Sequence, residues 1–209
     1  HVDIADGKFA PNTTWPFVQN EQMAEVASFR SLVNIPSHLK LEVHLMVESP
    51  EEIGMEFARA GFSITAHIEA FADAAAAHAA LGLWKDAGAP AVGLAAKLDT
   101  ALGSLDEAIP NCDYVHLLSV AQIGAQGQPF DERALDRVEE IHAKYPEILV
   151  AVDGGITEGT VEELVRAGAN RLSVGAAISR SENPAQSYVA LYYRALQGCA
   201  PLKADAFSC

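Results

Sequence analysis

Short apolar segments typical of buried strands alternate with amphipathic stretches along almost the whole chain. The strand-like segments end near seven positions: Asp3, Met46, His67, Ala96, Val120, Asp153 and Gly175. Between them, apolar residues recur at helical spacing over the ranges 21–33, 50–61, 71–88, 132–145, 157–168 and 184–196. A shorter helix is expected at about 100–108. This alternation predicts a parallel sheet covered by helices.

Two α/β architectures fit this alternation, an open doubly wound sheet and a (β/α)8 TIM barrel. The glycine fingerprint G-x-G-x-x-G of the open sheet is absent from every predicted strand-to-helix turn, which favours the barrel. We expect one barrel domain over residues 1–197, which starts at the end of the second strand, and a tail over residues 198–209. The first strand and helix are expected upstream of His1.

The composition narrows the class of protein. Of the 209 residues, 50% are hydrophobic and 20% are charged, as in a globular domain with a packed core. The formal net charge of -14 disfavours binding to nucleic acid or to an anionic membrane surface. The three cysteines lack metal-type spacing, and we find neither a bilayer-spanning apolar run nor a leader segment. We therefore expect a soluble, cytoplasmic protein.

Polar residues at the predicted strand ends are the candidates for chemistry, because barrel active sites lie at the carboxyl ends of the strands. Four such residues are His1, Asp3, His44 and Asp153. Taken singly, Asp153 could be a turn former before Gly-Gly, His44 a core histidine, and His1 the remnant of a tag. Together they match the ligands of a divalent cation such as zinc, iron(II), manganese or cobalt.

Two further features accompany these candidates. His67 and Glu69 lie at another strand end, where they could either support the metal ligands or be structural. The turns after the last two strands carry small residues that could hold a phosphate on backbone amides, aided by a helix that begins near Thr157. These small residues are Gly154, Gly155, Gly175 and Ala176. A glycine-rich loop, GAQGQPF at 124–130, could fold over a ligand.

The segments HVDIADGKFAPNTT and EVHLMVESPEE resemble two motifs of the ribulose-phosphate 3-epimerase family, H-x-D-x-M-D-G-x-F-V-P-N and D-V-H-L-M-V-x-x-P. AHIEA, VDGGIT and VGAAI match later motifs in the same order, and the resemblance extends to about residue 197. It implies a metal-dependent barrel isomerase of the pentose phosphate pathway, of the ribulose-phosphate binding type, that forms a homo-oligomer. Its reaction would interconvert D-ribulose 5-phosphate and D-xylulose 5-phosphate.

The resemblance also implies roles for individual residues. One divalent metal ion would be bound by His1, Asp3, His44 and Asp153. Asp3 and Asp153 would act as the acid/base pair, one on each face of carbon 3, while the cation stabilises the ene-diolate oxygens. The ketose phosphate would contact His44, Met46, Gly127, Gln128, Gly154, Gly155, Gly175 and Ala176.

Several positions depart from the family pattern. Ala5 and Leu118 stand where the family has methionines. The family's P-G-F-G-G-Q loop is QIGAQGQ here, at residues 122–128. Asn-Pro is replaced by Lys97-Leu98, and Gly-Ser by Gly175-Ala176. These changes concern the substrate more than the metal. Two alternatives therefore stay open: an epimerase of another ketose phosphate, such as allulose 6-phosphate, and a non-catalytic barrel that binds a sugar phosphate.

Overall fold

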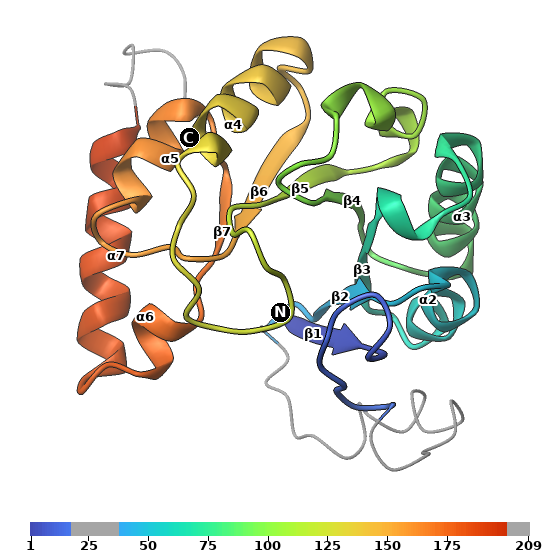
Figure 1. Cartoon of the computed structure of the whole chain (residues 1–209), viewed down its shortest axis with the longest axis horizontal. Helices are drawn as coiled ribbons and strands as arrows, with labels where there is room; N and C mark the ends of the chain where they lie inside the picture. Colours follow the sequence, from blue (N-terminus) through green and yellow to red (C-terminus); the bar gives the residue numbers. More distant parts are fainter. Residues whose placement is uncertain (18–37, 200–209) are drawn as a thin grey trace. The chain divides into compact units, whose positions relative to one another are not determined.

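A computed structural model describes residues 1–17 and 38–199 (Figure 1). Within them, seven strands occur in chain order in one sheet, β1 to β7. The chain divides into two compact units, His1–Val115 and His116–Cys209, and each is described by itself. Strand β5 (Tyr114–Leu118) contains the boundary. The parallel α/β sheet predicted from the sequence is confirmed.

The first unit consists of parallel strands and the helices that follow them. Its strands are β1 (Val2–Ala5), β2 (Glu42–Met46), β3 (Ser63–His67) and β4 (Val92–Ala96). Its helices are α2 (Pro50–Arg59) and α3 (Ala74–Ala87), with 3-10 turns η3 (Ile68–Ala70), η4 (Leu102–Leu105) and η5 (Ile109–Asn111). Helices α2 and α3 pack against each other and against strands β2 to β4. All residues of β2 and β4 are buried, as expected for strands of a covered parallel sheet.

A glycine in β4 shapes the polar interior of the first unit. The parallel register pairs Gly93 with Thr65 on β3. A β-carbon at Gly93 would overlap the ring of Tyr114, so the missing side chain is what admits this ring. Placed there, the Tyr114 hydroxyl lies 2.6 Å from the Thr65 hydroxyl.

Replacing Gly93 by alanine is expected to lower the free energy of unfolding by about 1–3 kcal/mol, the usual cost of overpacking a core. The physical reason is the overlap between the new methyl group and the Tyr114 ring. Denaturant unfolding measures the change. Gly103→Ala is the matched control, since a β-carbon there meets nothing within 4 Å. Equal unfolding midpoints for the two variants would show that the ring is not confined as described.

The second unit contains two further strands and four helices among the described residues. They are β6 (Leu149–Asp153), β7 (Arg171–Ser173), α4 (Arg133–Lys144), α5 (Val161–Ala167), α6 (Ala176–Ser179) and α7 (Pro184–Gly198). Strands β6 and β7 pair in parallel, and α5 packs against α4 and α7. No helix within residues 1–17 and 38–199 is both long and apolar enough to span a membrane.

Most predicted boundaries agree with the structure. Strand ends at Met46, His67, Ala96 and Asp153 are confirmed, whereas β1, β5 and β7 end two residues away from Asp3, Val120 and Gly175. The helix predicted at 21–33 lies outside the described residues. So does the tail predicted at 198–209, apart from its first two residues, and α7 includes Gly198.

Two helix predictions are corrected. The segment at about 100–108 forms the 3-10 turn η4 instead of an α-helix, because Gly103 favours a helix weakly. The next turn, η5, follows it, and its Pro110 cannot donate a helical hydrogen bond. The helix expected near Thr157 begins only at Val161. Thr157 instead lies in a turn, in which its backbone amide donates to the Thr160 hydroxyl.

Candidate active site

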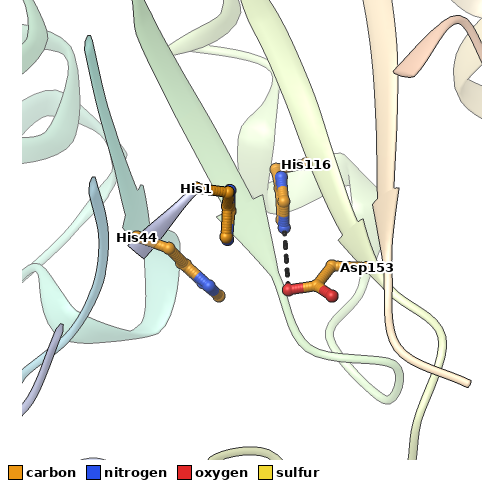
Figure 2. Close-up of side chains that lie close together, drawn as sticks. All are labelled: His1, His44, His116 and Asp153. Carbon is orange, nitrogen blue, oxygen red and sulfur yellow. Dashed lines mark ion pairs between the residues drawn. The ribbon is translucent and has the colours of Figure 1, made fainter. Parts of the chain in front are cut away.

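Three of the four predicted metal ligands lie together on one face of the first unit. The register pairs Asp3 with His44, and alternation along β1 puts His1 on the same face as Asp3. One carboxylate oxygen, Oδ1 of Asp3, lies 3.3 Å from His1 Nε2 and 3.2 Å from His44 Nδ1. The two imidazole rings are 5.5 Å apart between centroids (Figure 2). Two nitrogens and an oxygen therefore converge from β1 and β2.

The Asp3 carboxyl remains ionised in this setting. Burial acts to raise its pKa, but hydrogen bonds and positive charge from His1 and His44 outweigh burial and hold the pKa well below its usual range. An ionised carboxylate with two imidazoles is a donor set that suits zinc and other borderline divalent cations. The residues present in the first unit therefore fit such an ion.

Buried, hydrogen-bonded Glu42, Thr65 and Tyr114 support the nitrogen of His1 that does not face Asp3. This nitrogen, Nδ1, lies 3.0 Å from Oε1 of Glu42, which is 5% exposed. The same oxygen accepts a hydrogen bond from the Thr65 hydroxyl at 3.2 Å, and Thr65 in turn contacts Tyr114. These contacts satisfy the Glu42 carboxylate, whose burial without hydrogen-bond partners would cost free energy of folding.

A second group supports His44. Its Nε2 lies 2.9 Å from Nε2 of His67, whose Nδ1 lies 3.1 Å from Oε2 of Glu69. The other oxygen of Glu69 accepts hydrogen bonds from the Lys97 amide, at 2.8 Å, and from the Thr100 hydroxyl. Burial acts to raise the pKa of Glu69, but the hydrogen bond and charge of His67, with those two donors, lower it to about 2. His67 thus contacts the predicted ligand His44 directly, and Glu69 acts on it through His67.

The fourth predicted ligand, Asp153, ends β6 in the second unit. Its Oδ2 lies 3.7 Å from Nε2 of the buried His116, and Figure 2 draws this ion pair as a dashed line. The hydroxyl of Ser119 donates to the backbone carbonyls of Asp153 and Gly154, at 3.0 and 2.6 Å, and so fixes the end of the strand. His1, His44, His116 and Asp153 all carry metal-ligating atoms.

Sequence reasoning missed His116. The residue sits in the middle of the apolar strand segment YVHLL and is fully buried. The sequence does contain a signal for His116, because a histidine inside an apolar strand needs a polar partner. Alternation along the strand puts it on the same face as Tyr114 and Leu118.

The predicted phosphate-binding turns belong to the second unit. Gly154 and Gly155 have φ of 114° and 63°, which other residues rarely adopt. A β-carbon at Gly155 would lie 2.5 Å from the Phe130 backbone nitrogen, so the loop of residues 124–130 packs directly against this turn. Because α5 begins at Val161, its amino terminus follows the glycine pair only after a further turn.

The same loop also approaches the end of α6. A β-carbon at Gly127 would lie 2.6 Å from the guanidinium of Arg180, and that guanidinium donates to the Gln126 carbonyl at 3.3 Å. Gly175, which precedes α6, lies against the Gln126 side chain. Arg180 is a cation beside the predicted phosphate turn that sequence reasoning did not identify. The remaining predicted substrate contacts are Met46, buried at the end of β2, and Gln128, half-buried in the loop.

Solved structures define the class of fold. The chain is similar to 3-hexulose-6-phosphate synthase from Salmonella typhimurium, with a TM-score of 0.68 and 16% identity over 95% of this chain and 98% of that one. It is also similar to KGPDC from Streptococcus mutans, with a TM-score of 0.60 and 15% identity over 82% of this chain and 78% of that one. At such identities the likeness concerns the fold alone, which is of the TIM-barrel type.

The sequence comparison is more specific. The model of the ribulose-phosphate 3-epimerase family matches residues 1–179, and the chain belongs to this family. Ribulose-phosphate 3-epimerase of Aquifex aeolicus is 36% identical over 85% of this chain and 76% of its own length. The enzyme of the same name from Bacillus subtilis is 31% identical over 85% of this chain and 78% of its own length. The protein is therefore an isomerase of the epimerase class, as the resemblance implied.

Proposed function

We propose that the protein interconverts D-ribulose 5-phosphate and D-xylulose 5-phosphate in a metal-dependent reaction. The observation that carries the proposal is the ionised Asp3 carboxylate, whose Oδ1 faces His1 Nε2 and His44 Nδ1. Family membership supplies the reaction class. Purified protein assayed on several ketose phosphates, with and without added metal, tests the proposal.

The metal would be held by His1, Asp3, His44 and Asp153, with zinc, iron(II), manganese and cobalt as the candidate ions. When bound, it would supply positive charge that stabilises the ene-diolate oxygens of the substrate. The carboxylates move the proton. Asp3 or Asp153 removes the proton from carbon 3 on one face, and the other returns a proton on the opposite face, which inverts the centre. The hydrogen bonds of Ser119 position the strand end that carries Asp153.

The architecture proposed for this activity is one (β/α)8 barrel domain over residues 1–197, of the ribulose-phosphate binding type. The seven described strands would take seven of its eight strand positions. Their chain order supports this assignment, because neighbouring barrel strands follow one another in sequence.

The phosphate of the substrate would bind to backbone amides of Gly154, Gly155, Gly175 and Ala176, with Gly127 and Gln128 of the loop closing on the sugar. The positive φ angles at Gly154 and Gly155 support this role, since they allow the backbone to approach an anion.

Replacing Gly175 by leucine is expected to raise KM for the ketose phosphate about tenfold or more. A β-carbon there already lies 3.3 Å from the Gln126 amide, so a larger side chain would occupy the anion's place. One lost hydrogen bond to a charged group costs about 1.5–3 kcal/mol, enough for this effect. Steady-state kinetics measure KM, and a zinc titration of the same preparation should show unchanged affinity.

Gly159→Leu is the matched control for this variant, because a β-carbon at Gly159 meets only an ordinary contact, 3.6 Å from the Thr157 hydroxyl. A loss of zinc affinity in Gly175→Leu as large as the rise in KM would contradict the assignment of this turn to the phosphate.

The loop of residues 124–130 favours one second candidate, an epimerase of a longer ketose phosphate such as allulose 6-phosphate. Its contacts with Gly155 and Arg180 place it beside the proposed phosphate turns, where substrate length would matter. The ratio of kcat/KM for allulose 6-phosphate to that for ribulose 5-phosphate decides between the two. Inactivity toward both, with retained binding, would favour a non-catalytic barrel.

We also propose that the enzyme is a cytoplasmic homo-oligomer. An apolar face of α7 supports self-association, because its large side chains are 46% to 63% exposed: Tyr188, Val189, Tyr192, Tyr193 and Leu196. Sedimentation velocity on the purified chain measures the number of subunits.

A further inference from the structure

We propose that Glu69 and His67 are positioning residues that fix the tautomer of His44, so that the Nδ1 lone pair of His44 faces Asp3. The inference concerns two residues to which the proposed mechanism gives no role. It rests on the proposed metal site at His1, Asp3 and His44, and it adds the device that keeps one ligand nitrogen free of its proton.

The two imidazoles meet at their Nε2 atoms, 2.9 Å apart, in the interior of the first unit. His44 and His67 are both fully buried, and their rings are stacked with centroids 4.9 Å apart. When both rings are neutral, a hydrogen bond between these two nitrogens requires a proton on one Nε2 and a lone pair on the other. The position of that proton determines which nitrogen of His44 is left to bind a cation.

Glu69 decides the direction of this hydrogen bond. Its Oε1 accepts hydrogen bonds from the Lys97 amide and the Thr100 hydroxyl, two donors that favour the ionised carboxylate. An ionised carboxylate only accepts hydrogen bonds, so His67 Nδ1, 3.1 Å from Oε2, must carry a proton and donate it. Neutral His67 is then left with a lone pair on Nε2.

The lone pair on His67 Nε2 determines where neutral His44 carries its proton. His44 Nε2 carries the proton and donates to His67, and its Nδ1 keeps the lone pair, which faces Oδ1 of Asp3 at 3.2 Å. A charged His44 carries a second proton on Nδ1 and donates it to Asp3; once that proton is lost, two acceptors face each other at this distance and repel unless a cation lies between them. The pair from Asp3 and His44 is thus prepared for a positive ion, as histidine ligands commonly are when their other nitrogen donates to a fixed partner.

The opposite side of Asp3 shows the same arrangement, built from different residues. The Thr65 hydroxyl donates its single proton to Glu42, so it must accept a hydrogen bond from the Tyr114 hydroxyl. His1 Nδ1 donates to the same carboxylate oxygen of Glu42, which leaves the lone pair of His1 Nε2 facing Asp3 at 3.3 Å. When both imidazoles are neutral, they therefore present lone pairs to one carboxylate oxygen.

Glu69→Gln is the decisive variant. The two donors at Oε1 hold the amide oxygen in place, so the new NH₂ group faces His67 Nδ1 and donates to it. His67 must then carry its proton on Nε2, and His44 must accept there and move its own proton to Nδ1. We expect ¹⁵N-resolved NMR of the full chain to show this exchange of tautomers, and zinc affinity to fall about 10- to 100-fold.

The control is Glu56→Gln, which alters a partly exposed carboxylate paired with Arg59 and should leave tautomers and zinc affinity unchanged. The NMR spectrum of the unsubstituted chain provides a test that needs no variant. A neutral His44 that carries its proton on Nδ1 there, or an unchanged His44 tautomer in Glu69→Gln, would overturn the proposal. Failure of the unsubstituted chain to bind zinc, with the expected tautomers present, would instead contradict the proposed metal site.

Discussion

Asp3→Asn and Asp153→Asn are each expected to reduce turnover by at least about 100-fold, the scale associated with loss of a general acid or base. Asparagine preserves the size of the side chain but accepts no proton. Turnover is measured as interconversion of ribulose 5-phosphate and xylulose 5-phosphate. Because both positions are proposed metal ligands, metal content must be determined in the same preparations and rates expressed per bound metal.

Solvent exchange separates the roles of the two carboxylates. In deuterated water, a variant that retains one carboxylate can still exchange the carbon 3 proton of the epimer that this carboxylate faces, without completing the inversion. We expect one variant to incorporate deuterium into ribulose 5-phosphate and the other into xylulose 5-phosphate. A fully metallated variant that epimerises at nearly the parent rate would contradict the mechanism of two carboxylates.

Metal removal is expected to have the second large effect. Treatment with a chelator should reduce turnover by about 100- to 1,000-fold, since a contribution of about 3–4 kcal/mol to transition-state stabilisation corresponds to a loss of that size. Adding back zinc, manganese, cobalt or iron(II) should restore turnover. The ion that restores the highest rate per bound metal identifies the preferred cofactor.

His44→Leu should behave like chelated protein and should not recover when metal is added, because the variant lacks the nitrogen that faces Asp3. His78→Leu is the matched control, since this half-buried histidine on α3 contacts the Glu107 carbonyl and is not a predicted ligand. Full activity in the presence of chelator would exclude a catalytic metal.

The sequence predicted those parts of the site that depend on local patterning. Alternation along a strand is enough to put His1 and Asp3 on one face, and the position of His44 before the end of LEVHLMV places it at the same level of the sheet. The chain order implied that the two strands are parallel neighbours, and the register seen in the structure pairs His44 with Asp3.

Other parts of the site could not be predicted in this way, because they depend on tertiary packing. Tyr114 reaches Thr65 only because Gly93 leaves space for its ring, and a glycine in a strand can equally mark a bulge or a bend. His116 was overlooked since a single histidine in an apolar strand is usually structural. Arg180 approaches Gly127 through the folding of a long loop, for which no periodic pattern exists.

The misplaced helix start has a local cause. Thr157 and Thr160 hydrogen-bond to nearby backbone groups in a turn, and this competes with helix formation until Val161. The helix predicted over residues 157–168 is therefore present, but its first residues form a turn instead of helix.

The most direct test of the account follows the carbon 3 position of ribulose 5-phosphate by NMR, with the metallated protein in deuterated water. The two-carboxylate mechanism predicts that xylulose 5-phosphate forms with deuterium at carbon 3, because the returning proton comes from a group that exchanges with solvent, and that chelator stops both conversion and exchange. Absence of conversion, or product that retains the original hydrogen at carbon 3, would contradict it.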